Sequence, residues 1–204
     1  MKKLTYGVNG AKLNSYLKTI RKSGEALVLR TVRDAYDEDQ VWLLTPYLAL
    51  RVPAGWIYKE VMQPYTLTDA PEFGSWKDLQ GGSRDGESLV RAVEDIMAKA
   101  DRTAKNTGFT AELNGAKAPA NQVRVFALED GTPVAIDEDK AAVFERGQFV
   151  TYRGTTCNGA VVVEGEYIKG ILLPVRIGSE LKERMAALCA CFALPGARRE
   201  EQAA

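Results

Sequence analysis

The densest run of apolar residues lies at 160–177, AVVVEGEYIKGILLPVRI. Two stretches rich in Val, Ile and Leu flank the polar sequence Glu164-Gly165-Glu166, a pattern that predicts a β-hairpin. Glycine tolerates the positive φ that a tight turn demands, so Gly165 is expected at the turn. Pro174 has no N–H to donate to a ladder, so a sheet edge, a bulge or the strand's end is expected there. This hairpin should lie in the core.

Apolar residues spaced three and four apart predict four helices, at 11–22, 87–105, 138–146 and 179–192. The first helix should begin at Asn9 and end at Gly24. Asp85, Asp137 and Ser179 are the expected caps of the other three. The expected buried positions are, in chain order, Leu13, Tyr16, Leu17, Ile20; Leu89, Val93, Ile96, Met97, Ala100; Ala141, Val143, Phe144; Leu181, Met185, Leu188 and Phe192.

Alternating or β-branched stretches predict strands before and after these helices. They lie at 3–9, 25–33, 41–45, 47–52, 109–113, 122–128, 132–136 and 148–152, in addition to the hairpin. The order strand, helix, several strands therefore occurs twice, over 3–53 and 122–177, which indicates an internal duplication. We expect one domain over 1–204, with an insert at 54–121 and a C-terminal helix and tail at 178–204.

Composition removes several kinds of chemistry from consideration. The chain of 204 residues has no histidine, so a Ser-His-Asp or Cys-His catalytic group cannot form within it. Lys plus Arg equals Asp plus Glu, at 27 each, so no global field attracts nucleic acid or lipid. Three cysteines suit a reducing compartment, and no apolar run reaches the roughly 18 residues that span a bilayer. We expect a cytoplasmic protein with no membrane partner.

Four local patterns invite a chemical interpretation, and each has a plainer one. The acidic run Asp34–Asp39 could ligate a hard cation, but it lacks EF-hand spacing and suits a solvated hairpin tip. The sequence QGGSRDG lacks the Gly-Lys-Ser/Thr of a phosphate loop and suits a linker. Cys189 and Cys191 are two small residues of a helix, with too few further ligands for zinc. The aromatics of 42–76 suit a core or, alternatively, a groove for a peptide or bases. We therefore expect no cofactor, metal site or assigned catalytic residue.

The ending Leu172-Leu173-Pro174-Val175-Arg176-Ile177 resembles the last strand of bacterial DNA-polymerase sliding clamps. The segment 39–52, an acidic turn followed by VWLLTPYLALRV, is similar to a strand pair of the same family. The duplicated order also matches a clamp domain. The resemblance implies an α+β fold of two pseudo-symmetric β-α-β-β-β halves with antiparallel sheets and adjacent helices. To these the chain adds an inserted middle helix and a C-terminal helix.

The resemblance implies a non-enzymatic binding module, which a phage or mobile element could encode. Its partner would be duplex DNA or a peptide of a replication-type protein. The candidate nucleic-acid contacts are the cations of the first helix, Lys12, Lys18, Arg21 and Lys22; their plainer reading is a solvated outer face. Two features depart from the family. The second helix, 137–146, is acidic on balance, and a single domain cannot encircle a duplex, since clamp rings contain six.

Two other functions remain open from the sequence. The chain could be a small enzyme that uses carboxylates or a cysteine in a cleft between the halves. It could also be a structural subunit that acts by self-association. If the acidic run and the thiols share no cleft, the enzyme hypothesis loses its basis. The mass of the protein in solution tests self-association.

Overall fold

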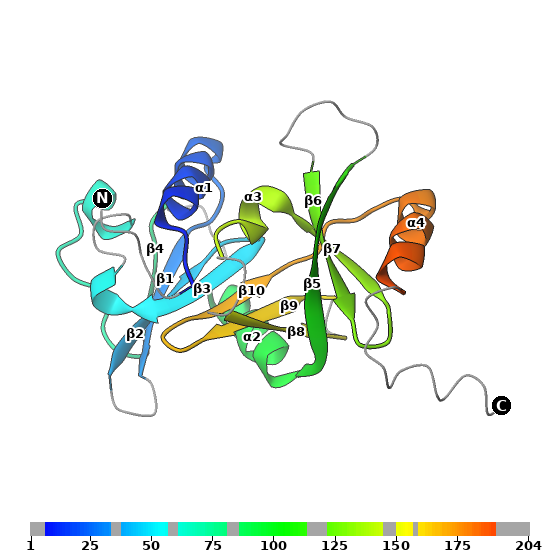
Figure 1. Ribbon diagram of the computed structural model, residues 1–204. Helices are drawn as coiled ribbons and strands as arrows, with labels where there is room; N and C mark the ends of the chain where they lie inside the picture. Colours follow the sequence, from blue (N-terminus) through cyan, green and yellow to red (C-terminus); the bar gives the residue numbers. More distant parts are fainter. Residues whose placement is uncertain are drawn as a thin grey trace.

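The computed structural model describes residues 7–33, 38–56, 61–80, 86–113, 122–144, 150–156 and 159–190. In this part of the chain ten strands form one sheet, in the order β4-β1-β2-β3-β10-β9-β8-β5-β6-β7 (Figure 1). Every pair of neighbouring strands is antiparallel. The α+β class and the antiparallel pairing expected from the sequence are therefore confirmed.

The elements have the following bounds. The strands are β1 (Val28–Arg33), β2 (Asp39–Leu44), β3 (Leu48–Pro53), β4 (Trp76–Asp78), β5 (Ala100–Glu112), β6 (Gln122–Leu128), β7 (Pro133–Asp137), β8 (Val150–Thr155), β9 (Val161–Gly165) and β10 (Lys169–Leu172). The helices are α1 (Gly10–Ser23), α2 (Gly86–Ala98), α3 (Glu138–Ala141) and α4 (Ser179–Cys189), with 3-10 turns η1 (Ala54–Trp56) and η3 (Gln63–Tyr65).

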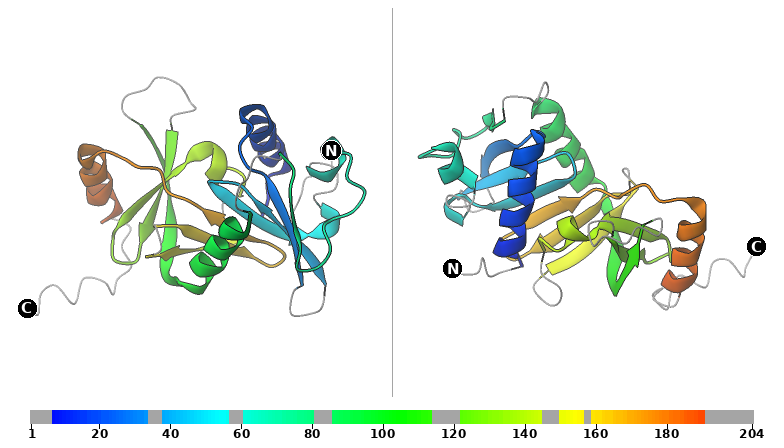
Figure 2. Two further views of the ribbon diagram at one scale, coloured as in Figure 1. Left: turned by 180° about the vertical axis from the view of Figure 1, so that it is seen from behind. Right: turned by 90° about the horizontal axis from the view of Figure 1, so that it is seen from above.

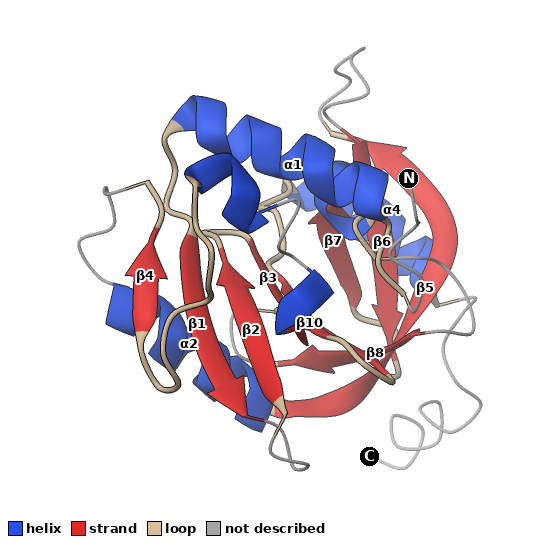
Figure 3. Ribbon diagram, turned by 90° about the vertical axis from the view of Figure 1, so that its left-hand side faces the viewer, coloured by secondary structure: helices blue, strands red, loops and turns tan. Residues whose placement is uncertain are grey.

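The sheet is strongly curved, and its helices lie on both faces. In Figure 3, α1 crosses the open side of the curve, whereas α2 lies against the outside. Figure 2 shows α4 at one end of the molecule and α1 well separated from it, over the other arm of the sheet. The largest core fills the concave side, where α1 and α3 meet side chains from both arms of the sheet, among them Leu29, Leu43, Phe126 and Ile136. Two smaller cores lie beneath α2 and α4.

The first helix forms as its pattern predicts. Asn9 Oδ1 accepts a hydrogen bond from Lys12 N at 3.2 Å, which satisfies one of the unpaired N–H groups of the first turn. Gly24 adopts φ +69° and closes the helix through its N–H to Ile20 O. The four predicted apolar positions, Leu13, Tyr16, Leu17 and Ile20, are all buried. The opposite face is therefore left to the polar residues.

The middle helix is shorter than expected. The prediction of 87–105 is wrong beyond Ala98, because β5 begins at Ala100 and continues to Glu112. Thr103 and Ala104 pair with β8, and Ala104 also pairs with β6, so two sheet neighbours override local helix propensity. The strand expected at 109–113 is the far part of this same β5. The region predicted as a connection thus supplies two strands, β4 and β5.

The apolar hairpin forms as β9 and β10, and both strands are largely buried. Gly165 is the last residue of β9 and is not at positive φ, so the expected role of this glycine is wrong. The turn closes instead through Gly165 N to Ile168 O at 3.0 Å, with Glu166 and Tyr167 between them. The strand ends at Leu172, shortly before Pro174, as the missing N–H predicts.

The C-terminal helix buries a different row from the one predicted. Met185 and Cys189 are buried, whereas Leu188 is 49% exposed. Leu181, Met185 and Cys189 are four residues apart, and this row packs on β6 and β7. Gly178, not Ser179, occupies the N-cap, and it makes no side-chain cap bond. In α3, by contrast, the predicted cap Asp137 and the buried Ala141 are confirmed.

Several expectations fall on residues outside the described part of the chain. These are the strand at 3–6, Asp34 to Asp37, most of QGGSRDG with Asp85, residues 145–149, Cys157, Cys191 and Phe192.

Candidate functional site

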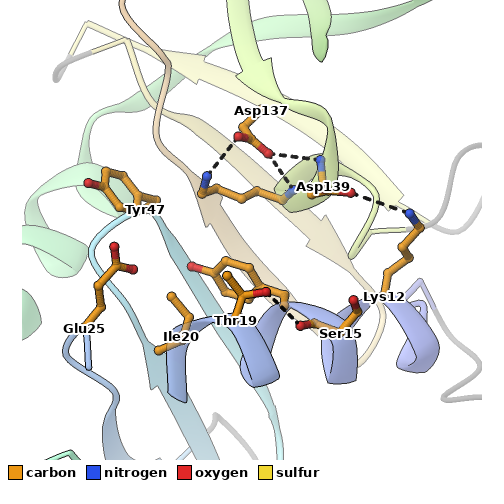
Figure 4. Close-up of a pocket in the computed structure, with 10 residues that line it drawn as sticks. Lys12, Ser15, Thr19, Ile20, Glu25, Tyr47, Asp137 and Asp139 are labelled. Carbon is orange, nitrogen blue, oxygen red and sulfur yellow. Dashed lines mark hydrogen bonds and ion pairs between the residues drawn. The ribbon is translucent and has the colours of Figure 1, made fainter. Parts of the chain in front are cut away.

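A cleft of about 210 Å³ lies between α1 and α3, on the concave side of the sheet (Figure 4). Its walls come from α1, from the end of β7 and the start of α3, and from the turn between β2 and β3. The lining residues are Lys12, Ser15, Tyr16, Thr19, Ile20, Glu25, Tyr47, Asp137, Asp139 and Lys140. Three carboxylates and two ammonium groups therefore share this small space.

Tyr16 belongs to the buried stripe of α1, and its hydroxyl lies 2.7 Å from Thr45 Oγ1. Thr45 Oγ1 donates its proton to Leu48 O at 2.7 Å, so Tyr16 must be the donor to Thr45. Burial, and to a lesser degree the carboxylates of Glu25 and Asp137, raise the pKa of Tyr16 well above its usual value. Tyr16 is thus a neutral hydrogen-bond donor that ties α1 to the β2–β3 turn.

Lys140 is held in place on the opposite wall. Its ammonium lies 3.1 Å from Asp137 Oδ2 and 5.0 Å from the centre of the Tyr47 ring. The other carboxylate oxygen of Asp137 accepts hydrogen bonds from Asp139 N at 3.0 Å and Lys140 N at 3.3 Å. Both oxygens of Asp137 are therefore engaged, one in capping α3 and one in pairing with Lys140 (Figure 4).

The predicted nucleic-acid residues do not act as one group. Lys12 lies beside the cleft and pairs with Asp139 at 3.6 Å, which links α1 to α3. Arg21 is half-buried, with its guanidinium 5.9 Å from the Tyr65 ring and its Nε bonded to Leu17 O. Lys18 and Lys22 are exposed, and neither makes an ion pair to another residue in the described ranges. Lys12 is exposed as well but already paired, so Lys18 and Lys22 are the two of the four that are both exposed and without an ion pair among the described residues.

Of the groups considered for catalysis, the structure describes Glu38, Asp39 and Cys189, and the thiol lies in a different element from the two carboxylates. Asp39 is at the start of β2 and pairs with Arg33 at 3.2 Å. Cys189 is the last residue of α4 and is buried between this helix and β6 and β7. Among the described residues, no three Asp, Glu or Cys side chains are placed to hold a metal ion.

The aromatic residues of 42–76 have mixed surroundings. Trp42 is 8% exposed and lies in the core beneath α2, as the plainer reading predicts. Tyr47, Phe73 and Trp76 are instead 47%, 59% and 42% exposed. The prediction that the aromatic residues lie in the core is therefore wrong for Tyr47, Phe73 and Trp76.

A second, wider hollow of about 570 Å³ was not predicted from the sequence. It lies beside β7, between the segment after β10 and the start of α4. Apolar side chains dominate it, including Leu128, Pro133 and Val175, and its lining has three cations, Arg102, Arg176 and Lys182, and no carboxylate. Its walls come from β5, β6, β7, β8 and residues 174–182, so no local motif could reveal it.

Comparison with known proteins found no matching family model, no similar curated protein and no similar solved structure. No helix in the described ranges is both long and apolar enough to cross a bilayer.

Proposed function

We propose that this chain is a non-enzymatic, clamp-like binding module that docks DNA or a replication-type protein partner. The supporting observation is the order of elements about the middle of the sheet. Helix α1 is followed by β1, β2 and β3, and helix α3 by β8, β9 and β10. In the sheet these strands read β1-β2-β3 and then β10-β9-β8, which is a mirrored sequence about the β3–β10 pair.

The geometry at this pair favours two halves related by a pseudo-two-fold axis. β3 and β10 are antiparallel, with Leu48 opposite Leu172 and Arg51 opposite Lys169. An antiparallel pair has a local two-fold axis perpendicular to its strands, and extending that axis would exchange α1 with α3. Both helices lie on the concave face and contact each other, and both have an Asx residue at the N-cap.

Charge distribution favours the C-terminal part of α1 as the DNA contact. Lys18 and Lys22 are exposed there, away from the carboxylates that surround the start of α3. Near the start of α3, Asp137 and Asp139 would repel phosphate, and Lys12 is already paired, whereas Glu25 is the cleft carboxylate that lies near Lys22. A ring around a duplex would require several copies, so the proposal includes self-association.

The wide hollow beside β7 is the better place for a protein partner. A concave, mostly apolar surface with a few polar groups suits a peptide segment anchored by an apolar side chain. Arg102 already pairs with Asp130 at 3.1 Å, but Arg176 and Lys182 would favour acidic residues beside that anchor.

The test is the salt dependence of binding to a labelled DNA duplex, measured by fluorescence anisotropy. Each phosphate neutralised contributes roughly −0.9 to the log–log slope. Lys18→Gln with Lys22→Gln should therefore flatten the slope by up to about two units, while changing stability by only a few tenths of a kcal/mol.

The matched control is Lys99→Gln with Lys105→Gln, which removes two exposed cations outside α1 and should leave the slope nearer the wild-type value. Equal slopes for both double variants would remove α1 as the contact. No binding by monomer or oligomer at tens of micromolar would reject DNA docking, and a discrete oligomer in that case would favour the structural subunit.

A further inference from the structure

The convex face of the sheet has a row of aromatic and cationic residues that the proposed function does not use. Strand register places Trp76 opposite Arg30, Arg30 opposite Trp42, Trp42 opposite Arg51, and Arg51 opposite Lys169. Residues opposite one another on neighbouring strands point to the same face. We call these five residues the outer row. It crosses β4, β1, β2, β3 and β10, a span of about 19 Å at ~4.8 Å per strand.

The face of the outer row is fixed by its neighbours. Trp42 packs in the core beneath α2, so the whole row lies on the side of α2 and away from α1. Val90 and Val93 of α2 border a narrow hollow with Arg30 and Trp42, so α2 lies beside this part of the row. The outer row is thus separated from Lys18 and Lys22 by the thickness of the sheet.

Exposure is low at Trp42 and higher toward both ends of the outer row. Trp42 is 8% exposed, whereas Trp76 on the edge strand β4 is 42% exposed and belongs to none of the three cores. The side chains of Arg30 and Lys169 are 25% and 36% exposed. An indole is therefore available at one end of the row, with cationic groups accessible along it.

The charge along the row is positive on balance. Arg30 pairs with Glu94 at 3.5 Å, and Lys169 pairs with Glu164 at 3.6 Å. Glu164 also pairs with Arg153 of β8 at 3.1 Å. Asp78 of β4 lies opposite Val28, a residue of the core beneath α2, and so points to the same face. With Arg51, four cations therefore share this surface with three carboxylates.

We propose that the outer row binds single-stranded nucleic acid. An exposed aromatic ring offers a stacking platform to any base, and guanidinium and ammonium groups along a line pair with successive phosphates. A duplex cannot use Trp76 in this way, because its bases are already stacked on one another. Single-stranded nucleic acid therefore matches both the aromatic and the charged parts of the row.

The test uses a fluorescein-labelled oligothymidylate of about 12 nucleotides, within the usual size of such sites. Binding to the full chain should weaken with salt and should quench tryptophan fluorescence. Trp76→Ala should lower the affinity at least about five-fold, as the loss of one stacked base does. Lys169→Gln should flatten the log–log salt slope by about 0.7, the contribution of one phosphate on a single strand.

The matched control is Lys77→Gln. Lys77 follows Trp76 on β4 but lies opposite Leu29, whose side chain is in the concave core, so it points to the other face. This variant should leave Trp76 quenching and affinity near wild-type. The Lys18→Gln, Lys22→Gln variant should also bind the oligothymidylate normally, which separates this surface from the proposed duplex contact. Thermal melts followed by circular dichroism verify that each variant is folded.

Three results would overturn the proposal. The first is no binding at tens of micromolar protein in low salt. The second is binding that Trp76→Ala and Lys169→Gln leave unchanged. The third is equal binding of polyglutamate that depends on Lys169 but not on Trp76, which would make the row a surface for acidic polypeptides.

Discussion

Arg124 holds the short helix α3 in place against β6. It lies on the core side of β6 and is 2% exposed, yet its guanidinium is well satisfied. Its Nε and Nη2 donate to the two carboxylate oxygens of Glu138 at 3.0 and 2.6 Å, and Nη1 donates to Ala141 O at 3.0 Å. One side chain thus binds both ends of a four-residue helix that could not persist alone.

Replacing Glu138 by Gln should therefore destabilise the protein more than its partly exposed position suggests. The change leaves the buried guanidinium without a counter-charge, a loss that costs about 3–5 kcal/mol when both groups are fully buried. The Glu138 side chain is 21% exposed, so we expect a value near or somewhat below 3 kcal/mol, measured by urea unfolding. Glu164→Gln, which alters more exposed pairs, is the control and should cost under about 1 kcal/mol. Similar costs for the two variants would contradict this account.

Tyr16 should make stability depend on pH in alkaline solution. Its pKa is raised in the fold, so the folded state keeps the phenol proton after the unfolded state has lost it. The stabilisation is fully present below the unfolded pKa of about 10 and declines as the pH rises beyond it. Tyr16→Phe should remove this component, so the stability difference between wild type and variant should shrink from pH 9 toward about pH 11 in denaturant melts. A difference that stays constant over this range would show that Tyr16 does not titrate with unfolding.

At the scale of elements, the sequence predicts those whose stabilising contacts are local. The α1 stripe, its Asn9 cap and its Gly24 end all lie within one stretch and were predicted correctly. Residues 100–105 look equally helical by spacing, but they become part of β5 because β6 and β8 lie on either side. Those neighbours come from sequence positions that periodicity cannot bring together. The same limit applies to α4, whose buried row depends on the shape of β6 and β7.

The end of β10 offers a matched pair of substitutions. The sequence pattern alone predicts a cost of about 2–5 kcal/mol for Leu173→Ala, as for a fully buried leucine. Leu173 is instead only partly buried and lies after the strand, whereas Leu172 is 0% exposed in the main core. We therefore expect that full cost at Leu172→Ala and a clearly smaller one at Leu173→Ala, measured by urea unfolding. If Leu173→Ala cost as much free energy as Leu172→Ala, or more, Leu173 would be buried and the strand would extend past Leu172.

At the scale of the whole molecule, the sequence predicts the α+β fold class and the exposed cations of α1, but it does not predict where the concave surfaces lie. Lys18 and Lys22 face solvent because the buried stripe of α1 dictates it. The sequence predicts neither the cleft beside Asp137 nor the hollow beside β7. The cleft joins segments about a hundred residues apart, and the hollow joins segments several tens of residues apart. Nothing in a local pattern specifies which turns will meet. The outer row also depends on register across five strands, which the sequence leaves open.

The antiparallel pair at the middle of the sheet has a consequence for the order in which the chain can fold during synthesis. β3 ends at Pro53, but its partner β10 begins only at Lys169, so one long edge of the N-terminal strands has no neighbour until most of the protein has left the ribosome. Such an edge, here rich in Leu and Val, can pair with other nascent chains. Closing so large a loop is also slow, because contacts of high sequence separation delay folding. Chains that terminate before residue 169 should therefore aggregate, whereas a chain that includes β10 covers this edge itself.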